Sequence, residues 1–293
     1  MTASIQARLL GPLEIERAGR PVAIGGRAQR ALLTRLLLDA GRTVSVDRLV
    51  DDLWGESAPA SAQKMVQIYV SMLRKALPEG VIVTRSPGYA VELPTEGIDL
   101  VRFENLRERG RAALAAGAAA EARDLLRQAL ALWRGPALAE FQEPFAEIEA
   151  RRLDEQHLAT LEDRIDADLA LGGDSSLIGE LEALVARHPL RERARGQLML
   201  ALYRAGRQAD ALEGHRRFRE MLSEELGIEP SPALRELERR ILQHDPALDS
   251  ARSRGSVRGH VSHSSRAVRQ GVVRWSGCVP SPNPLIPRLR IAA

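Results

Sequence analysis

The chain has 293 residues, of which 44% are apolar and 3% aromatic, and its formal net charge is +3. At ~150 residues per domain this length predicts two domains, whose cores leucine, alanine and valine must fill. The lone cysteine, Cys278, excludes an intramolecular disulfide. Because neither a secretory signal nor an apolar run of ~18 residues is present, we expect a cytoplasmic protein without a membrane span.

Charge is segregated along the chain. Residues 1–95 hold 12 Lys+Arg against 9 Asp+Glu, residues 96–245 hold 22 against 29, and residues 246–293 hold 8 against 1. A basic front and an acidic middle imply different partners, because nucleic acid attracts the first and repels the second. We therefore expect a DNA-binding front domain over 1–95, a separate middle domain over 96–245, and a tail over 246–293.

The first 54 residues predict short strands followed by two helices. Extended runs separated by glycine-containing turns lie at 5–10, 13–16 and 21–24. The helices are expected at 27–40 and 46–54, with a short strand at 43–44 between them. Gly41 closes the first helix, and Ser45 is placed to cap the second. Asp47, Asp51 and Asp52 lie early enough in the second helix to favour its dipole.

The next helix, expected over 60–77 with Ser61 as its N-cap, is amphipathic. Its apolar stripe follows a spacing of four, three and four: Val66, Val70, Leu73 and Leu77. The other faces carry no acid and hold Lys64, Gln67, Ile68, Tyr69, Ser71, Met72, Arg74 and Lys75. A helix with one buried and one cationic side suits the major groove of DNA. For a helix considered alone, a solvated basic face is the simpler interpretation.

Residues 81–93 complete the front domain. Two β-rich runs flank Ser86-Pro87-Gly88, which predicts a hairpin with Arg85 at its tip. Strands, three helices and a hairpin, in this order, are typical of a winged helix-turn-helix, whose recognition helix enters the major groove. The hairpin of such a unit reaches the neighbouring minor groove. The neighbours of the basic helix therefore favour DNA binding over a merely solvated face.

Three sequence motifs in this front domain resemble those of the OmpR/PhoB-type DNA-binding domain. They are Leu49-Val50-Asp51-Asp52-Leu53-Trp54-Gly55, the stripe of 66–77 with Ile68, Ser71, Arg74 and Lys75, and Ile82-x-Thr84-Arg85-x-x-Gly88-Tyr89. The resemblance implies that Lys64, Ile68, Tyr69, Ser71, Met72 and Arg74 face DNA and that Arg85 is the minor-groove arginine of the wing. Ser71 and Met72 stand where the PhoB-like branch has base-reading arginines, so a different target sequence is implied.

Several of these residues have alternative roles. Arg74, at the flank of the helix, suits a phosphate contact better than a base contact. Tyr69 is equally compatible with packing under the wing. Ile68 and Met72 are compatible with an interface between two copies of the chain as well as with contacts to thymine methyl groups. Trp54 and Tyr89 are expected in the core.

The acidic middle segment, residues 96–245, is predicted to form successive helices with an internal repeat. Gly117 to Ala122 matches Gly206 to Ala211, and a fainter copy begins at Gly172. In each copy a helix ends at glycine and a helix rich in small residues follows. The 34-residue interval between the last two glycines is the tetratricopeptide period. This pattern predicts stacked helical hairpins, which usually serve as interaction surfaces; a plain helical bundle is the alternative.

The middle also resembles the bacterial transcriptional activator domain. The matching words include Phe141-Gln142-Glu143-Pro144-Phe145, His188-Pro189-Leu190-Arg191-Glu192 and Glu225-Leu226-Gly227-Ile228-Glu229-Pro230-Ser231. Together, residues 5–245 look like a small AfsR/SARP-type antibiotic regulatory protein. That resemblance implies an activator of secondary-metabolite genes that binds direct repeats in double-stranded promoter DNA as a side-by-side homodimer, recruits RNA polymerase and acts at the nucleoid.

The remaining features predict no catalysis. We expect no enzyme, because no phosphate-binding loop, nucleophile elbow or metal motif is present, and therefore no cofactor or metal. The arginine-rich composition of 246–293 predicts disorder, and His260 and His263 lack further metal ligands. A DNA-binding repressor or architectural protein, and a scaffold whose front domain is only structural, stay open as alternatives to an activator.

Overall fold

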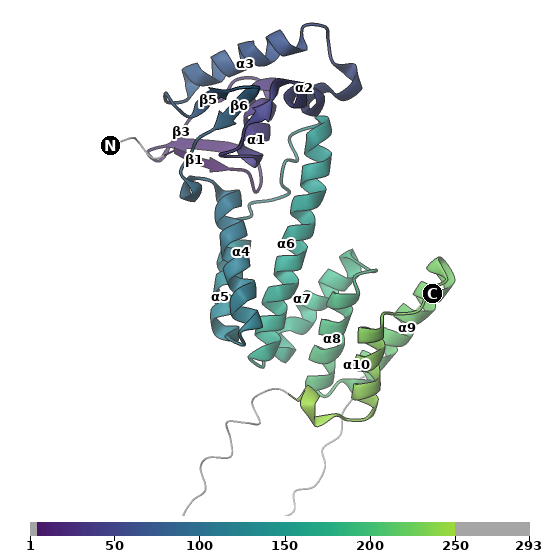
Figure 1. The fold of residues 1–293 in the computed structure, drawn as a ribbon. Coiled ribbons are helices and arrows are strands. Elements are labelled where there is room, and N and C mark those ends of the chain that lie inside the picture. The colour runs from purple at the N-terminus through teal and green to yellow at the C-terminus, as the bar shows by residue number, and fades with distance from the viewer. Residues whose placement is uncertain (1–4, 250–293) are drawn as a thin grey trace, which may run out of the picture. The chain divides into compact units, whose positions relative to one another are not determined.

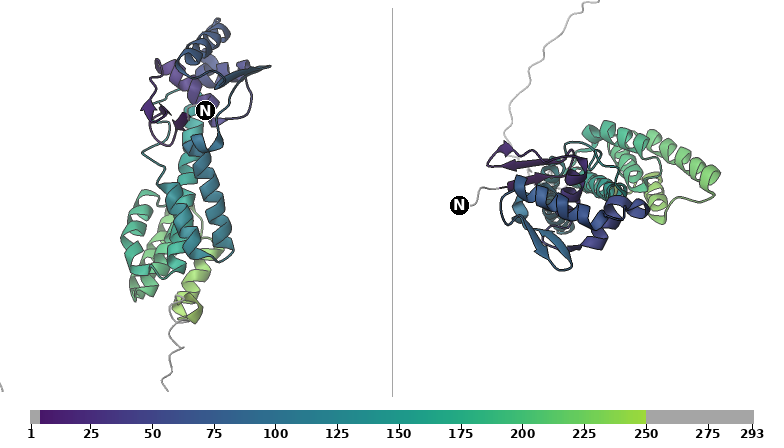
Figure 2. Two further views of the ribbon diagram at one scale, coloured as in Figure 1. Left: turned by 90° about the vertical axis from the view of Figure 1, so that its left-hand side faces the viewer. Right: turned by 90° about the horizontal axis from the view of Figure 1, so that it is seen from above.

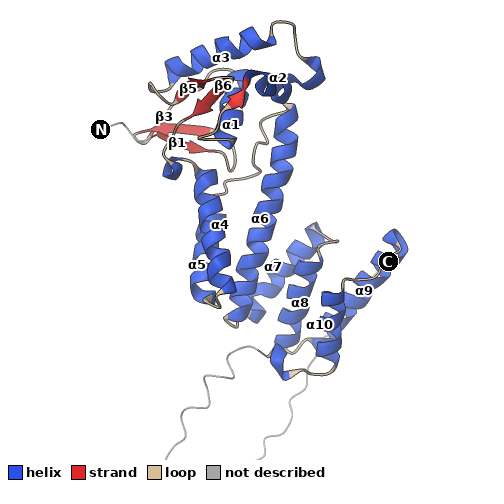
Figure 3. Ribbon diagram, in the orientation of Figure 1, coloured by secondary structure: helices blue, strands red, loops and turns tan. Residues whose placement is uncertain are grey.

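The computed structural model describes residues 5–249, apart from the side chains of Thr95 and Asp174. It confirms the predicted fold class, because two small sheets with three helices are followed by helical hairpins (Figures 1 and 3). The predicted disorder from residue 246 was wrong for its first residues, because Pro246–Leu248 forms a 3-10 turn whose Leu248 packs in a hydrophobic core. The predicted tail beyond residue 249, with His260, His263 and Cys278, lies outside the described residues. No helix in the described part is long and apolar enough to span a membrane.

The front region contains two three-stranded antiparallel sheets. The first has the order β1-β2-β3, formed by Ile5–Arg8, Glu14–Arg17 and Arg20–Pro21. The second has the order β4-β6-β5, formed by Val44–Ser45, Gly88–Val91 and Ile82–Arg85. Helix α1 (Arg27–Leu38) lies between β3 and β4, while α2 (Val46–Trp54) and α3 (Ala62–Ala76) lie between β4 and β5. This is the element order of the predicted winged helix-turn-helix.

Two predicted helix caps have different outcomes. The backbone N–H of Arg48 donates to Ser45 Oγ at 3.1 Å, which confirms Ser45 as the cap of α2. Ser61 precedes α3 but makes no capping hydrogen bond. Its φ and ψ of −92° and 9° lie outside the extended region that a capping side chain requires, so that part of the prediction was wrong.

The second acidic pair of α2 has a role that its sequence position did not suggest. Asp52 is buried at 6% exposure and accepts hydrogen bonds from both Arg35 of α1 and Arg48 of α2. Arg35 also contacts Asp39 at 2.7 Å. Asp52 therefore ties α2 to α1 through a buried ion pair. The prediction that Asp51 and Asp52 favour the helix dipole was wrong, because only Asp47 lies in the first turn of α2.

The helical region runs from Asp99 to Leu242 and is followed by a 3-10 turn. Its helices are α4 (Asp99–Ala115), α5 (Ala119–Leu130), α6 (Pro144–Ala170), α7 (Asp174–Arg187), α8 (Glu192–Arg204), α9 (Gln208–Leu226) and α10 (Pro232–Leu242). The repeat glycines Gly117, Gly172 and Gly206 have φ values of 76°, 81° and 78°. Only glycine adopts this left-handed conformation without strain, and each one ends a helix where the repeat predicted a turn.

Two main hydrophobic cores divide the described chain at a place that composition did not indicate. The first core extends from Ile5 to Leu153 and includes Phe103 of α4 and Phe145 of α6 together with the buried faces of α1, α2 and α3. The second extends from Ile165 to Leu248, and a small cluster lies between α4, α5 and α6. The hydrophobic core of the front region therefore does not end at the predicted boundary, residue 95, but continues into the first half of α6, as far as Leu153.

Candidate nucleic-acid interface

Helix α3 lies on the outside of the front region, with α1 and α2 on its inner side (Figures 1 and 2). The predicted apolar stripe holds it there, because Val66, Val70, Leu73 and Leu77 are between 0% and 6% exposed. Burial of four such side chains fixes which side of α3 faces outward. The recognition face, defined as the outward side of α3, then presents Lys64, Gln67, Ile68, Ser71, Met72, Arg74 and Lys75, all of them exposed.

The lysines of the recognition face differ from most cations among residues 5–249. Lys64 and Lys75 are its only lysines, and among residues 5–249 neither forms an ion pair. By contrast, Arg193 of α8 and Arg216 and Arg217 of α9 are engaged by carboxylates of their own or a neighbouring helix. A charged amine without an internal partner remains available to an external anion, so these two side chains suit phosphate contacts.

Arg74 links the recognition helix to the wing. Its Nε donates to the carbonyl oxygen of Ile82 at 3.0 Å, and its Nη2 donates to Thr84 Oγ1 at 2.8 Å. The guanidinium also lies 5.8 Å from the centre of the Tyr89 ring. Two of its N–H donors thus bind β5 and hold α3 against this strand. The remaining N–H groups of the guanidinium can donate to a phosphate.

The wing is held against the helices by the short strand β4. Val44 pairs with Tyr89 and Ser45 with Gly88, while β5 pairs with β6 from Ile82–Val91 to Arg85–Gly88. A side chain at Gly88 would place Cβ 1.9 Å from the carbonyl oxygen of Val44, so only glycine permits this approach. Arg85 ends β5 beside the turn, exposed, and pairs with Glu92 at 2.5 Å.

The aromatic residues settle one open alternative. Tyr69 is half-buried and stacks on Trp54 of α2, with ring centres 6.4 Å apart and an interplanar angle of 24°. The alternative that it packs under the wing was wrong, because it lies on the α2 side of α3. Trp54 and Tyr89 are also half-buried, and both pack against the first core as expected.

A seam between the first sheet and the helical region contains a residue that sequence reasoning missed. Asp99, the first residue of α4, is 6% exposed and accepts backbone N–H groups of Leu9 at 2.7 Å and Leu10 at 3.1 Å. Burial raises the pKa of this carboxyl against the opposing effect of those two N–H groups. Ninety residues separate the partners, so no local spacing could have revealed the contact.

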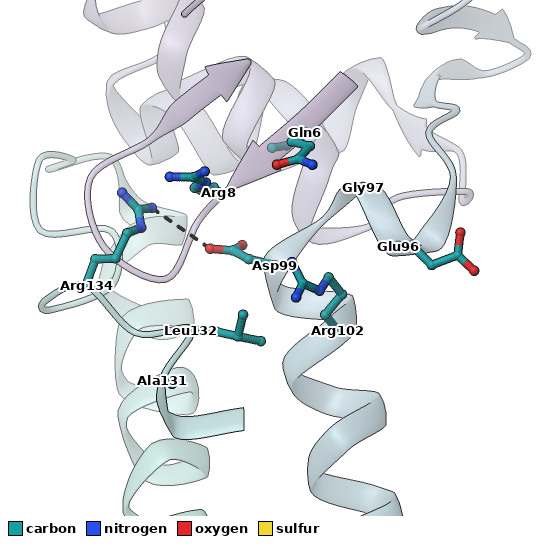
Figure 4. Close-up of a pocket in the computed structure, with 10 residues that line it drawn as sticks. Gln6, Arg8, Glu96, Gly97, Asp99, Arg102, Ala131, Leu132 and Arg134 are labelled. Carbon is teal, nitrogen blue, oxygen red and sulfur yellow. Dashed lines mark ion pairs between the residues drawn. The ribbon is translucent and has the colours of Figure 1, made fainter. Parts of the chain in front are cut away.

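A small hollow of about 220 Å³ lies at this seam and is shown in Figure 4. Arg134 reaches towards Asp99 at 3.9 Å, contacts Glu14 at 2.8 Å and donates to the carbonyl oxygen of Pro12 at 3.0 Å. Arg8 is paired with Glu14 and Glu16. Carboxylates of the chain thus already neutralise the guanidinium groups of Arg8 and Arg134 at this hollow.

Comparison with known proteins identifies the family. The model for the C-terminal domain of transcriptional regulatory proteins matches residues 19–91, and the model for the bacterial transcriptional activator domain matches residues 98–242. Regulatory protein DnrI of Streptomyces peucetius is 38% identical over 257 residues, which cover 84% of this chain and 94% of DnrI. The chain belongs to the AfsR/SARP-type family of transcriptional regulators.

Other members of this family differ in length. Regulatory protein AfsR of Streptomyces coelicolor is 48% identical over 248 residues, covering 84% of this chain but 25% of AfsR, so the chain spans a quarter of that relative. The solved structure of Mycobacterium tuberculosis EmbR in complex with a low affinity phosphopeptide matches with a TM-score of 0.80 and 39% identity. The match covers 83% of this chain and 66% of EmbR. It supports the order of winged helix and helical region described above.

Within residues 5–249 no group of three or more His, Cys, Asp or Glu side chains is arranged to hold a metal ion. The family consists of transcriptional regulators.

Proposed function

We propose that the chain binds double-stranded promoter DNA sequence-specifically, with α3 in the major groove and the wing at the adjacent minor groove. One observation carries the proposal: the recognition face is exposed and has no acidic residue, and its lysines form no ion pair within residues 5–249. Lys64 and Lys75 contact phosphates, Gln67 and Ser71 supply hydrogen-bonding groups, and Arg85 leaves Glu92 to enter the minor groove. Phosphate contacts orient the protein, and base contacts select the sequence.

The lysine content of the chain permits a direct test. An amine-reactive acetylating reagent finds side-chain amines only at Lys64 and Lys75, so mass spectrometry of acetylated lysine reads the recognition face without interference from other lysines. We expect a promoter duplex to protect both residues. Equal labelling with and without saturating DNA would contradict the assignment of α3.

Salt dependence tests the same contacts in free solution. Each phosphate neutralised by the protein contributes about 0.9 to the slope of log affinity against log salt. The Lys64→Ala, Lys75→Ala double variant is expected to lower that slope by about 2. Arg217→Ala, which removes an exposed cation of α9 that pairs with Glu213, is the matched control and should leave the slope unchanged. An unchanged slope in the double variant would exclude both phosphate contacts.

We further propose that the protein activates secondary-metabolite genes, binds direct repeats as a side-by-side homodimer and recruits RNA polymerase through its helical region. Family membership supports these finer points, and chromosomal DNA as the partner makes the cytoplasmic nucleoid the place of action. Transcription in vitro with the full chain separates the alternatives: more transcript indicates an activator, and less transcript a repressor. Sedimentation on duplexes with one or two repeats tests the homodimer.

Recruitment of polymerase requires an experiment that keeps the front core intact. Deletion of residues 96–245 would remove Phe103 and Leu153 from the first core and so damage the DNA-binding part itself. Substitutions of exposed apolar residues in the full chain avoid this problem. Ile148 and Leu190, 68% and 54% exposed, are suitable positions. If this surface contacts polymerase, Ile148→Asp and Leu190→Asp lower transcript yield at unchanged DNA affinity; unchanged yield for both would place the contact on another surface.

A further inference from the structure

Two neighbouring apolar side chains lie at the centre of the recognition face. Ile68 and Met72 are 44% and 46% exposed, although they belong to the side of α3 that otherwise carries polar and cationic groups. Residues four apart lie on the same side of a helix, so the two tips form one small apolar patch. Lys64 lies one turn before this patch, and Lys75 about one turn after it.

The Met72 side chain is held in place from another helix. Gln29, in the first turn of α1, lies with its Nε2 3.1 Å from Met72 Sδ. The amide of Gln29 in turn occupies space left by Gly25, because a Cβ at that glycine would lie 2.2 Å from Gln29 Oε1. Methionine is a flexible side chain with three rotatable bonds. A hydrogen bond from α1 therefore restricts Met72 to fewer conformations before any ligand arrives.

The chemistry of these two tips selects one feature of the major groove. An isoleucine side chain and the methyl end of methionine have no donor with which to contact guanine or adenine edges. The C5-methyl group of thymine is the apolar feature that base edges present in the major groove. Successive thymine methyl groups suit the patch, because residues four apart on a helix are separated by about 6 Å along its axis, against a rise of about 3.4 Å per base step.

We propose, as a refinement that rests on the proposed DNA binding, that Ile68 and Met72 read the C5-methyl groups of two thymines one or two base pairs apart. Gln29 acts as a positioning residue that orients Met72 without touching DNA. The patch is less suited to a seam between two copies of the chain. Such a seam would bring Lys64, Arg74 and Lys75 of both copies together, and like charges facing each other oppose association.

The test removes single methyl groups from DNA. The probe is the duplex that the full chain selects from a randomised pool, and each thymine in it is replaced in turn by deoxyuridine, which lacks only the C5-methyl group. Affinity is measured by fluorescence anisotropy at constant salt. We expect a loss of about fourfold at two thymines, the equivalent of exposing one buried methyl group. Met72→Ala should abolish the thymine preference at one of them, and Ile68→Ala at the other.

Gln29→Ala distinguishes positioning from contact. It should reduce the thymine preference at the Met72 position and leave the Ile68 position unchanged, whereas a general loss of folding would weaken both. Equal affinity for thymine and deoxyuridine at every position would overturn the inference and leave DNA binding standing. A change in sedimentation of Met72→Ala without DNA, with thymine preference retained, would instead indicate an oligomer seam. Selection of no sequence from the pool would overturn the proposed function as well.

Discussion

Replacement of Asp99 by alanine tests the seam that connects the first sheet to α4. In the unchanged chain, the backbone nitrogens of Leu9 and Leu10 lie 2.7 and 3.1 Å from the carboxylate oxygens of Asp99. The substitution leaves both N–H groups buried without this acceptor. Each unsatisfied buried donor costs about 1–3 kcal/mol. Because burial raises the pKa of Asp99, removal of a desolvated carboxylate offsets part of this loss. We therefore expect the free energy of unfolding to fall by about 2–4 kcal/mol.

Urea unfolding followed by tryptophan fluorescence measures this change, since Trp54 and Trp133 both pack against the first core. Asp99→Asn keeps one acceptor oxygen and should lose less, about 1–3 kcal/mol. Glu96→Ala removes an exposed carboxylate one turn earlier and is the matched control. If Asp99→Ala and Glu96→Ala unfold at the same urea concentration as the unchanged chain, the seam does not stabilise the front region.

The pH dependence of the same measurement has a defined sign. A carboxyl whose pKa is higher in the folded than in the unfolded chain binds more protons when folded, so its contribution to stability declines as pH rises through the folded pKa. The stability difference between the unchanged chain and Asp99→Asn should accordingly be larger near the ordinary aspartate pKa of about 3.9 than at neutral pH. A difference that grows with pH would contradict the assigned cause of the shift.

Two further predictions concern the wing and the second core. Gly88→Ala forces Cβ against the Val44 carbonyl oxygen, and should lower DNA affinity at least tenfold in anisotropy while helix content by circular dichroism is retained. The carboxylate of Glu162, 1% exposed, accepts two hydrogen bonds from Arg191, at 2.9 and 3.0 Å. Arg191→Ala removes both and leaves only Arg193, 3.7 Å away, as a cationic partner. The free energy of unfolding in urea should fall by about 3 kcal/mol. Unchanged affinity or unchanged unfolding, respectively, would refute these two expectations.

Local sequence pattern was sufficient for the elements of the fold. The spacing of Val66, Val70, Leu73 and Leu77 predicted which side of α3 is buried, because a helix turns by about 100° per residue irrespective of what covers it. Gly117, Gly172 and Gly206 predicted the turns between helices for a similarly local reason, since the left-handed backbone they adopt is accessible mainly to glycine. The wing followed from two β-rich runs around a turn.

Pattern alone did not reveal contacts between residues far apart in sequence. Asp52 lies in the last turn of α2 and Asp99 begins α4, and only their surroundings distinguish them from the exposed acids nearby. Likewise, the engagement of Arg74 by the wing and of Met72 by Gln29 depends on how separate elements pack. Arg74 and Met72 are therefore held in particular orientations on the recognition face. The sequence predicted where this face lies, but it did not predict these orientations.

The amino-acid sequence by itself determined the helices and their buried sides, the wing, the repeat and the cationic character of α3, because each depends on neighbours within a few turns of the chain. Tertiary structure decided where the first core ends, which charges are neutralised internally, and which side chains on α3 are oriented by another element. The reason is physical: burial, ion pairing and restricted rotation arise from groups up to 127 residues apart, whose proximity exists only once the chain has folded.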